Sequence, residues 1–250
     1  MIPELADLLR KSIDETLEEK IAIAFSGGLD SSLIAHIANA SSEIDLFTCG
    51  VKGSEDLQYA EQVAALFHRP LFAHEFSEQE ILQIYEKCFA IVPGDLLKVE
   101  LLVPVYQLAV MAKENAHKAI LFGSASEELF IGYERYYTYA KEGKDLNRIL
   151  QEEFRTLKGR EIAWIKKVCY KFGIEARFPF YNNKLADFVF SVPLNRRMED
   201  YKLKKGLLRE AGKLLGLNEI ALQRKKRAMQ YGSGVHKILL KHAKELNGIK

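Results

Sequence analysis

The most constraining feature of the sequence is an apolar run that enters a turn of glycine and serine and then resumes as a helix pattern. It covers residues 21–38 and reads IAIAFSGGLDSSLIAHIA. A short apolar run bounded by glycine predicts a buried strand, and the renewed apolar periodicity predicts a helix directly after the turn. A strand that feeds a helix in this way opens a βαβ unit, so the stretch predicts a parallel sheet.

The same alternation of strand and helix continues along the first half of the chain. Apolar runs at 44–51 and 70–76 predict two more strands, and a further run ending at Gly123 follows a helix pattern. After Gly123 helical patterns dominate, and no further strand is predicted. We therefore expect an α/β fold in which a parallel sheet carries helices on both faces. Residues 1–123 form its core and residues 124–250 a helical remainder, either as a second domain or as part of one continuous domain.

Composition excludes several classes of protein. Apolar residues make up 48% of the 250 residues, which is enough for a buried core. No apolar run approaches the length of a membrane span, and the acidic, amphipathic N-terminus lacks the features of a signal peptide. The three cysteines are scattered and no Cys/His set has zinc spacing, so neither a disulfide scaffold nor a zinc site is expected. We expect a cytoplasmic protein with no membrane partner.

The net charge of +2 is unevenly distributed along the chain. Residues 196–250 contain 15 Lys/Arg against 5 Asp/Glu, a net +10, so the rest of the chain carries −8. A basic segment on an acidic body indicates an anionic ligand near the C-terminal part. The alternative for most of these lysines is a solvated helix face.

The turn itself has the chemistry of a phosphate cradle. Gly27 and Gly28 remove side chains, so backbone N–H groups can approach an anion closely. The following helix directs its positive end to the same place, and three serines add hydroxyl donors: Ser26, Ser31 and Ser32. Asp30 would repel phosphate unless it holds a backbone turn or a Mg²⁺ between the two. The Walker A pattern is absent, and a capped helix with a tight turn explains only part of this set.

Strand, SGGLDSS and helix together resemble the PP-loop of the ATP pyrophosphatases. Four further segments resemble blocks of the synthetase domain of asparagine synthetases, in the family order: ILFGSASEELFIGYERY at 120–136, IEARFPFYNNKLADFVFSVP at 174–193, KKGLLREA at 204–211 and QRKKRAMQYGSG at 223–234. β-Lactam synthetases share this domain. The resemblance implies an adenine nucleotide alpha hydrolase-like fold, with residues 1–123 as its ATP-binding core. It also implies ATP and Mg²⁺ as cofactors, and cleavage of ATP to AMP and pyrophosphate.

The resemblance assigns roles to individual residues. It implies a catalytic group of Asp30, Glu127 and Lys205, in which Lys205 stabilises charge on the phosphates or on the reacting acyl group. Metal ligation is implied for Asp30, Glu127 and Glu128, although the family's usual residue at position 127 is aspartate. Nucleotide contacts are implied for a larger set, whose last two members match cations that line the exit path of pyrophosphate: Ser26, Gly27, Gly28, Asp30, Ser31, Ser32, Gly50, Val51, Gly123, Arg224 and Lys226.

The chain departs from the family pattern in the half that supplies and accepts nitrogen. Position 2 is Ile2, where the family's glutaminase domain has a cysteine nucleophile, and only residues 1–20 precede the first strand. We therefore expect no glutamine hydrolysis in this chain, with ammonia or an amine coming from solution or from a separate glutaminase subunit. The family's Gly-Gly-Tyr becomes Ile-Gly-Tyr at 131–133, so the acceptor pocket is expected to differ.

A second departure concerns an acid–base residue. The family places a glutamate ahead of the Pro-x-Tyr found here at Pro104 and Tyr106, where it acts as a base on the incoming amine. Val92 stands at that position, and valine has no acid–base capacity. Asp95 and Glu100 are the nearest carboxylates that could replace it after a shift of the loop.

Three functions remain open from the sequence. The first is an ATP-dependent ligase that adenylates a carboxylate, aspartate by default, releases pyrophosphate and transfers the acyl group to ammonia or another amine. The second is a PP-loop enzyme that adenylates a base of tRNA: the basic tail suits RNA, but the cysteine pairs of thiolating members are absent. The third is a nucleotide-binding relic without catalysis, which the change at Val92 favours and the intact turn opposes.

Overall fold

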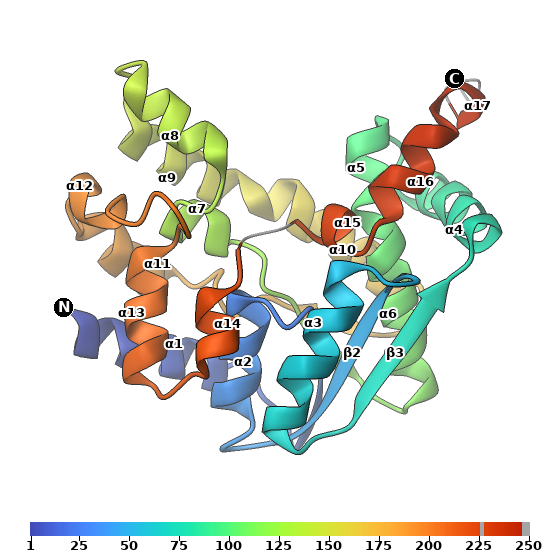
Figure 1. Ribbon diagram of the computed structural model, residues 1–250, viewed down its shortest axis with the longest axis horizontal. Helices are drawn as coiled ribbons and strands as arrows, with labels where there is room; N and C mark the ends of the chain where they lie inside the picture. The colour runs from blue at the N-terminus through green and yellow to red at the C-terminus, as the bar shows by residue number, and fades with distance from the viewer. Residues whose placement is uncertain (226–227, 247–250) are drawn as a thin grey trace.

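The structure, a computed structural model, describes residues 1–225 and 228–246 (Figure 1). Its centre is a five-stranded sheet in which each neighbouring pair of strands is parallel. The strands are β1 (Lys20–Ala24), β2 (Glu43–Val51), β3 (Leu71–Phe76), β4 (Ala119–Leu121) and β5 (Glu175–Arg177). Their order across the sheet is β3-β2-β1-β4-β5. The expected α/β class with a parallel sheet is therefore confirmed.

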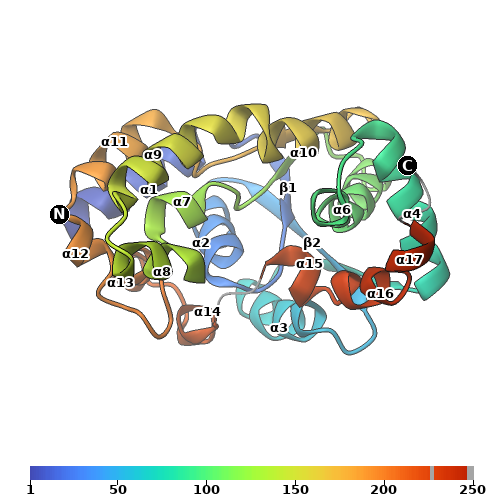
Figure 2. The same cartoon turned by 90° about the horizontal axis from the view of Figure 1, so that it is seen from above.

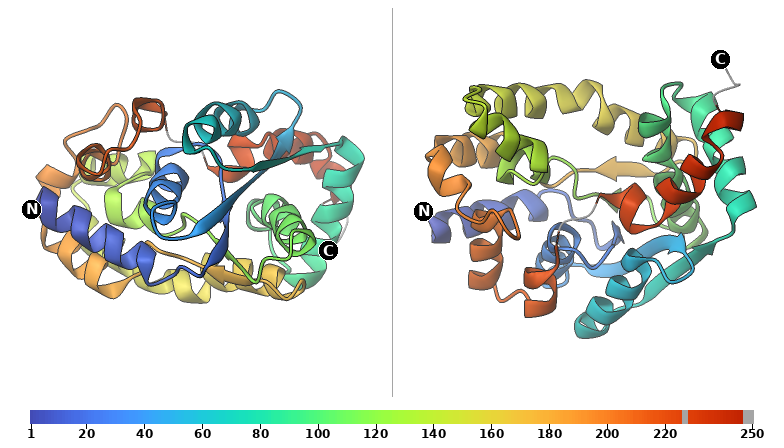
Figure 3. Two further views of the ribbon diagram at one scale, coloured as in Figure 1. Left: turned by 90° about the horizontal axis from the view of Figure 1, so that it is seen from below. Right: turned by 45° about the horizontal axis from the view of Figure 1, so that its top comes forward.

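Helices cover both faces of this sheet, as expected. The helices of the described residues are α1 (Ile2–Asp14), α2 (Leu29–Ala38), α3 (Glu55–Ala64), η1 (Ala65–Phe67), α4 (Glu78–Ile91), α5 (Leu96–Glu100), α6 (Leu102–Glu114), α7 (Ser126–Phe130), α8 (Glu134–Lys141), α9 (Leu146–Thr156), η2 (Leu157–Gly159), α10 (Glu161–Tyr170), α11 (Asn183–Ser191), α12 (Leu194–Arg197), α13 (Gly206–Leu214), α14 (Glu219–Gln223), α15 (Met229–Gly232), α16 (Val235–Lys241) and α17 (Ala243–Leu246). α2 and α3 lie on one side of the sheet and α6 on the other, where α4 and α10 pack against α6 (Figure 3).

The central strands are buried on both faces because their residues are almost all apolar. In β1 every residue after Lys20 is buried, and β2 is buried in all but its two terminal residues. The two strands pair from Lys20 opposite Glu43 to Ala24 opposite Phe47. Continuous apolar runs of this kind are typical of parallel strands that are covered by helices on both faces.

The fifth strand corrects the expectation that no strand follows Gly123. β5 pairs with β4 along its whole length. It is three residues long and only Ala176 in it is buried, so it carries no apolar periodicity that predicts a strand. The sheet and the main hydrophobic core both contain residues from each side of Gly123. Residues on both sides of Gly123 thus share one sheet. Whether the two parts are separate domains stays a prediction.

The strand order determines where a ligand can bind. From β1 the chain moves outward through β2 to β3 and then crosses to β4, on the other side of β1. A crevice forms outside the carboxyl ends of the strands at such a reversal, and ligands of open α/β sheets bind there. The turn at 25–28 and the loop at 122–125 both leave the sheet at this point, and α15 lies nearby between α3 and α6 (Figure 2). Among the described residues, none of the helices combines the length and apolar character that crossing a membrane requires.

Candidate functional site

Glycine and serine shape the turn after β1 as the sequence predicts. Gly27 has φ +69°, and a Cβ there would lie 2.4 Å from the carbonyl oxygen of Tyr59, so glycine is required. The Ser31 hydroxyl accepts the Ser26 N–H and donates to the Gly28 carbonyl oxygen, each at 3.3 Å. The Ser26 hydroxyl accepts the Gly28 N–H, also at 3.3 Å. The turn is thus held by its own hydroxyl groups, and α2 begins directly after it with its positive end at the crevice.

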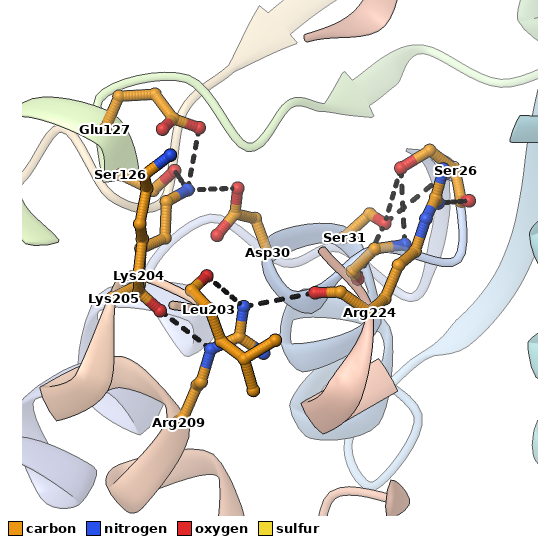
Figure 4. Close-up of polar contacts among 11 residues, drawn as sticks. Ser26, Asp30, Ser31, Ser126, Glu127, Leu203, Lys204, Lys205, Arg209 and Arg224 are labelled. Carbon is orange, nitrogen blue, oxygen red and sulfur yellow. Dashed lines mark hydrogen bonds and ion pairs between the residues drawn. The ribbon is translucent and has the colours of Figure 1, made fainter. Parts of the chain in front are cut away.

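A buried lysine joins this turn to the loop after β4. Lys205 Nζ donates to Asp30 Oδ2 and to Glu127 Oε1 at 2.7 Å each, and to Ser126 Oγ at 2.9 Å (Figure 4). Lys205 is only 2% exposed and Glu127 only 6%. A buried charge needs partners, and three acceptors match the three ammonium hydrogens. The structure therefore brings together the three residues that the sequence predicts as catalytic.

Backbone geometry fixes the position of this lysine. Lys204 and Lys205 have positive φ angles of 62° and 57°, which are uncommon for residues other than glycine. Gly132 passes so close that a Cβ there would lie 1.6 Å from Glu127 Oε2 and 2.6 Å from Lys205 Cε. A side chain at Gly132 would therefore displace the ends of the Glu127 and Lys205 side chains, even though the residue before this glycine differs from the family pattern.

Two buried arginines fasten the loops around the site. Arg224 donates to the carbonyl oxygen of Ser26 and, at 2.6 Å, to Asp56 Oδ1. Arg209 in turn donates to the Arg224 carbonyl oxygen at 3.1 Å. Because the Arg224 guanidinium binds the backbone of the turn, it holds the cradle in shape. Its contact with departing pyrophosphate stays a prediction.

A cavity of about 480 Å³ opens at the reversal of strand order. This volume is in the range of small-molecule sites. Nine of the predicted residues line it: Ser26, Gly28, Asp30, Ser31, Gly123, Glu127, Glu128, Lys205 and Arg224. Residues of β2 and α6 supply apolar surface suited to a flat ring: Phe47, Pro104, Val105 and Leu108. The cavity therefore combines anion-binding and apolar surfaces, as a nucleotide requires.

Four predicted residues do not line the cavity: Gly27, Ser32, Gly50 and Val51. The last two end β2, where the C-terminal part of the chain covers them, since the Val51 N–H donates to the Ser233 carbonyl oxygen at 2.8 Å. Thr48 and Cys49, just before them in β2, line the cavity instead. Nucleotide contacts by Gly50 and Val51 stay a prediction, and the cavity reaches β2 two positions earlier, at Thr48 and Cys49. Lys226 lies outside the described residues.

A further part of the lining, here called the acidic–aromatic wall, consists of Glu128, Tyr133, Glu161 and Trp164. Burial raises the pKa of Glu128 to about 8, and the nearby Glu161 and Glu127 carboxylates add to the rise. Glu128 therefore keeps its proton at neutral pH. Burial also raises the pKa of Tyr133, so Glu128 and Tyr133 are both neutral hydrogen-bonding groups at neutral pH.

Sequence reasoning missed the contribution of α10 to this wall. α10 falls within the helical remainder that is expected after Gly123, yet its residues Glu161 and Trp164 line the cavity. They lie three residues apart, so they share one face of the helix. The only sequence signal was that Trp164 is the single tryptophan of the chain.

The expected substitutes for the missing family glutamate do not reach the cavity. Val92 is buried beyond the end of α4, and Asp95 caps α5 by accepting the Lys98 N–H at 2.9 Å. Glu100 is fully buried, and its Oε2 lies 2.8 Å from His236 Nδ1. None of these three residues belongs to the described lining. These three residues therefore offer no acid–base group to the cavity.

The residues around Lys205 fit a magnesium ion that is shared with a nucleotide. Asp30 and Glu127 direct carboxylate oxygens, the ligands that Mg²⁺ prefers, at one cationic group. The described part of the chain holds no cluster of three His, Cys, Asp or Glu side chains able to bind a metal ion. Metal ligation by Asp30, Glu127 and Glu128 stays a prediction, and the positions of Asp30 and Glu127 around one cation support it most directly. Two carboxylates suit an ion that takes its other ligands from phosphate and water.

Comparison with known proteins identifies the family. The family described as asparagine synthase matches residues 4–171 and 140–248, which together span nearly the whole chain. The chain belongs to the asparagine synthase family, and the resemblance inferred from its motifs is confirmed.

Individual relatives agree with this assignment. A glutamine-hydrolyzing asparagine synthetase of Methanocaldococcus jannaschii is 29% identical over 261 residues, which cover 91% of this chain and 48% of that relative. Glutamine-hydrolyzing asparagine synthetase B of Escherichia coli is 28% identical over 228 residues, which cover 83% of this chain and 41% of that relative. The chain thus spans about half the length of these relatives, or less. Among solved structures, the NMN synthetase of Francisella tularensis matches with a TM-score of 0.47 and 15% identity, over 100% of this chain and 85% of that one.

Proposed function

We propose that the chain is an ATP-dependent ligase that adenylates a carboxylate, releases pyrophosphate and transfers the acyl group to ammonia or another amine. One observation carries the proposal: Lys205 lies between Asp30 and Glu127, beside a glycine–serine anion cradle, in a cavity at the reversal of strand order. Family membership supports the same class of chemistry. Aspartate is the default substrate, and the cytoplasm is the expected location.

The first half-reaction uses the cradle. A substrate carboxylate oxygen attacks the α-phosphorus of ATP, the bond from that phosphorus to the bridging oxygen breaks, and pyrophosphate leaves. The cradle N–H groups and the Lys205 ammonium stabilise the negative charge that moves onto the leaving group. Asp30 and Glu127 would hold Mg²⁺, which supplies further charge neutralisation on the phosphates when bound.

The second half-reaction uses the acidic–aromatic wall. The amine nitrogen attacks the acyl carbon, AMP leaves, and the nitrogen loses a proton. We assign that proton to the Glu161 carboxylate, which lines the same cavity. Glu128 is less suited to this role at neutral pH because burial raises its pKa to about 8. Ammonia would come from solution or from a glutaminase partner, as the glutamine-hydrolyzing relatives suggest.

An ATP–pyrophosphate exchange screen tests the proposal. Labelled pyrophosphate, ATP and Mg²⁺ are incubated with the protein and one candidate at a time from the proteinogenic amino acids, with bulk tRNA as a separate arm. We expect exchange to depend on one carboxylate compound and to disappear in Asp30→Asn. Exchange that depends on tRNA would move the protein to the tRNA-modifying alternative. Absence of exchange with every candidate would contradict the ligase and favour a nucleotide-binding protein without catalysis.

A further inference from the structure

We infer that a groove between α9 and α11 binds a free amino acid with an aromatic side chain, at a site separate from the cavity at the reversal of strand order. The groove has a volume of about 480 Å³, which is in the range of small-molecule sites. Among the described residues, none lines both the groove and the cavity. The inference concerns a second ligand, so it does not depend on the proposed function.

Three aromatic rings form the apolar side of the groove, where α9 and α11 lie side by side (Figure 2). Phe154 of α9 stacks on Tyr181, with ring centroids 4.8 Å apart, and meets Phe190 of α11 edge to face at 5.8 Å. Phe154 is buried, whereas Tyr181 and Phe190 are only half-buried, so their rings leave apolar surface for a ligand. A further ring fits such a cluster well because aromatic pairs prefer offset-stacked and edge-to-face contacts.

The rim of the groove carries charges of both signs. Arg155 of α9 and Asp187 of α11 line the groove and are exposed. Within the part of the chain that the structure describes, neither side chain forms an ion pair or a hydrogen bond. The other arginine of α9, Arg148, pairs with Glu152 at 3.4 Å. The groove therefore offers one cation and one anion to a ligand.

This pair of charges selects a zwitterion. A phosphate or a simple carboxylic acid would bind Arg155 but would face the Asp187 carboxylate, and a simple amine would meet the reverse difficulty. A free α-amino acid carries its carboxylate and its ammonium on one carbon atom, so it can pair with both side chains while its own side chain reaches the aromatic rings. An internal residue of a polypeptide lacks both charges, so a peptide segment fits this rim less well.

Uncharged polar side chains complete the rim: Gln151, Asn183 and Ser191. The Ser191 hydroxyl donates to the Phe188 carbonyl oxygen at 2.7 Å, and its oxygen can still accept a hydrogen bond from an ammonium group. An apolar surface with a small number of polar groups around it is the usual composition of a small-molecule site. The lining thus has partners for each part of an aromatic amino acid.

Isothermal titration calorimetry with L-phenylalanine tests the inference. The full chain is titrated with L-phenylalanine, with 3-phenylpropionate, which lacks the ammonium group, and with phenethylamine, which lacks the carboxylate. We expect each of the two truncated probes to bind about tenfold more weakly than L-phenylalanine, because each leaves one charged side chain of the rim without its partner.

Matched variants locate the binding in the groove. Arg155→Met should weaken L-phenylalanine binding about tenfold without weakening phenethylamine binding. Asp187→Asn should weaken L-phenylalanine binding to a similar extent without weakening 3-phenylpropionate binding. Arg148→Met, on the same helix but outside the groove, should change none of the three affinities. All three side chains are exposed, so we expect these variants to fold, and circular dichroism of each one verifies this.

Three results would overturn the inference. The first is absence of L-phenylalanine binding at millimolar concentration. The second is binding that neither groove variant weakens, and its loss in Asp30→Asn would place the amino acid in the cavity as a candidate substrate. The third is a dimer by light scattering that dissociates in Arg155→Met and binds no amino acid, since the groove would then be an interface between two copies. None of these readouts requires turnover, so they are independent of the exchange screen.

Discussion

The cradle side and the acidic–aromatic wall of one cavity are built in opposite ways. The cradle is a contiguous turn whose glycine conformation and hydroxyl contacts act within a few residues. The wall is assembled from side chains that lie on different helices or loops, with Glu161 and Trp164 coming from α10. A turn of this kind tolerates little change, whereas a wall of side chains can be altered one residue at a time. On the proposed function, the difference explains why the side that would adenylate matches the family pattern better than the side that would accept the amine.

The two regions also treat charge differently. Beside the cradle, carboxylates are matched by cations: Asp30 and Glu127 by Lys205, and Asp56 by Arg224. In the wall, burial keeps Glu128 protonated at neutral pH. On the proposed function, the cradle side suits highly charged phosphates, and the wall suits a smaller acceptor that is recognised by hydrogen bonds and aromatic contact.

The largest expected effect comes from a substitution on the cradle side of the cavity. Lys205→Met removes the ammonium that stabilises charge on pyrophosphate, so the rate of ATP–pyrophosphate exchange should fall about 10²–10³-fold. Exchange kinetics at saturating ATP measure the loss. Lys204→Met, one residue away on the same strained segment, should retain exchange close to the wild-type rate. Equal losses in the two variants would show that the segment, and not the Lys205 charge, is what matters.

The next effect separates the two half-reactions. Glu161→Gln removes the carboxylate assigned to take the amine proton, so amide formation should fall about 10²-fold while exchange stays nearly unchanged. Mass spectrometry of the amide product and the exchange assay measure the two rates. Glu152→Gln, on the exposed surface of α9, is the control and should change neither rate. A parallel fall in exchange would mean that the wall acts on adenylation as well.

A smaller effect tests the shape of the turn. Gly27→Ala adds a Cβ that would lie 2.4 Å from the Tyr59 carbonyl oxygen, in a residue with φ +69°. Gly53 has nearly the same φ, +71°, but an added Cβ there meets nothing closer than 4.0 Å, so Gly53→Ala isolates the backbone strain. We expect Gly27→Ala to lose about 2 kcal/mol more of the free energy of unfolding than Gly53→Ala. Equal losses in urea unfolding would remove the close approach as the reason for glycine at this position.

The same contrast decides what could be predicted from the sequence. The cradle could be predicted from the sequence alone because the glycines and serines that shape it lie within a few residues of one another. Lys205 needed a resemblance, since it follows Asp30 by 175 residues and nothing local ties the two together. β5 could not be predicted because Ala176 is its only buried residue. Trp164 could not be assigned to the cavity, because an aromatic residue on the apolar face of a helix is more often part of the core.

The smallest effect concerns the wall and is a change of stability with pH. Burial raises the pKa of Glu128 from 4.5 to about 8, so between these values the folded protein keeps a proton that the unfolded chain has released. Wild-type stability should therefore fall as pH rises through this window and level off above it. The glutamine of Glu128→Gln does not titrate. The free energy of unfolding of this variant, relative to that of the wild type, should therefore increase with pH by up to about 1.4 kcal/mol per pH unit within this window. Urea unfolding at pH 6 and pH 7 measures the difference, which should be at most about 1.4 kcal/mol, with Glu152→Gln as the exposed control. If the two proteins changed in parallel with pH, Glu128 would be ionised in the folded state and would not supply the neutral group that separates the wall from the paired charges of the cradle side.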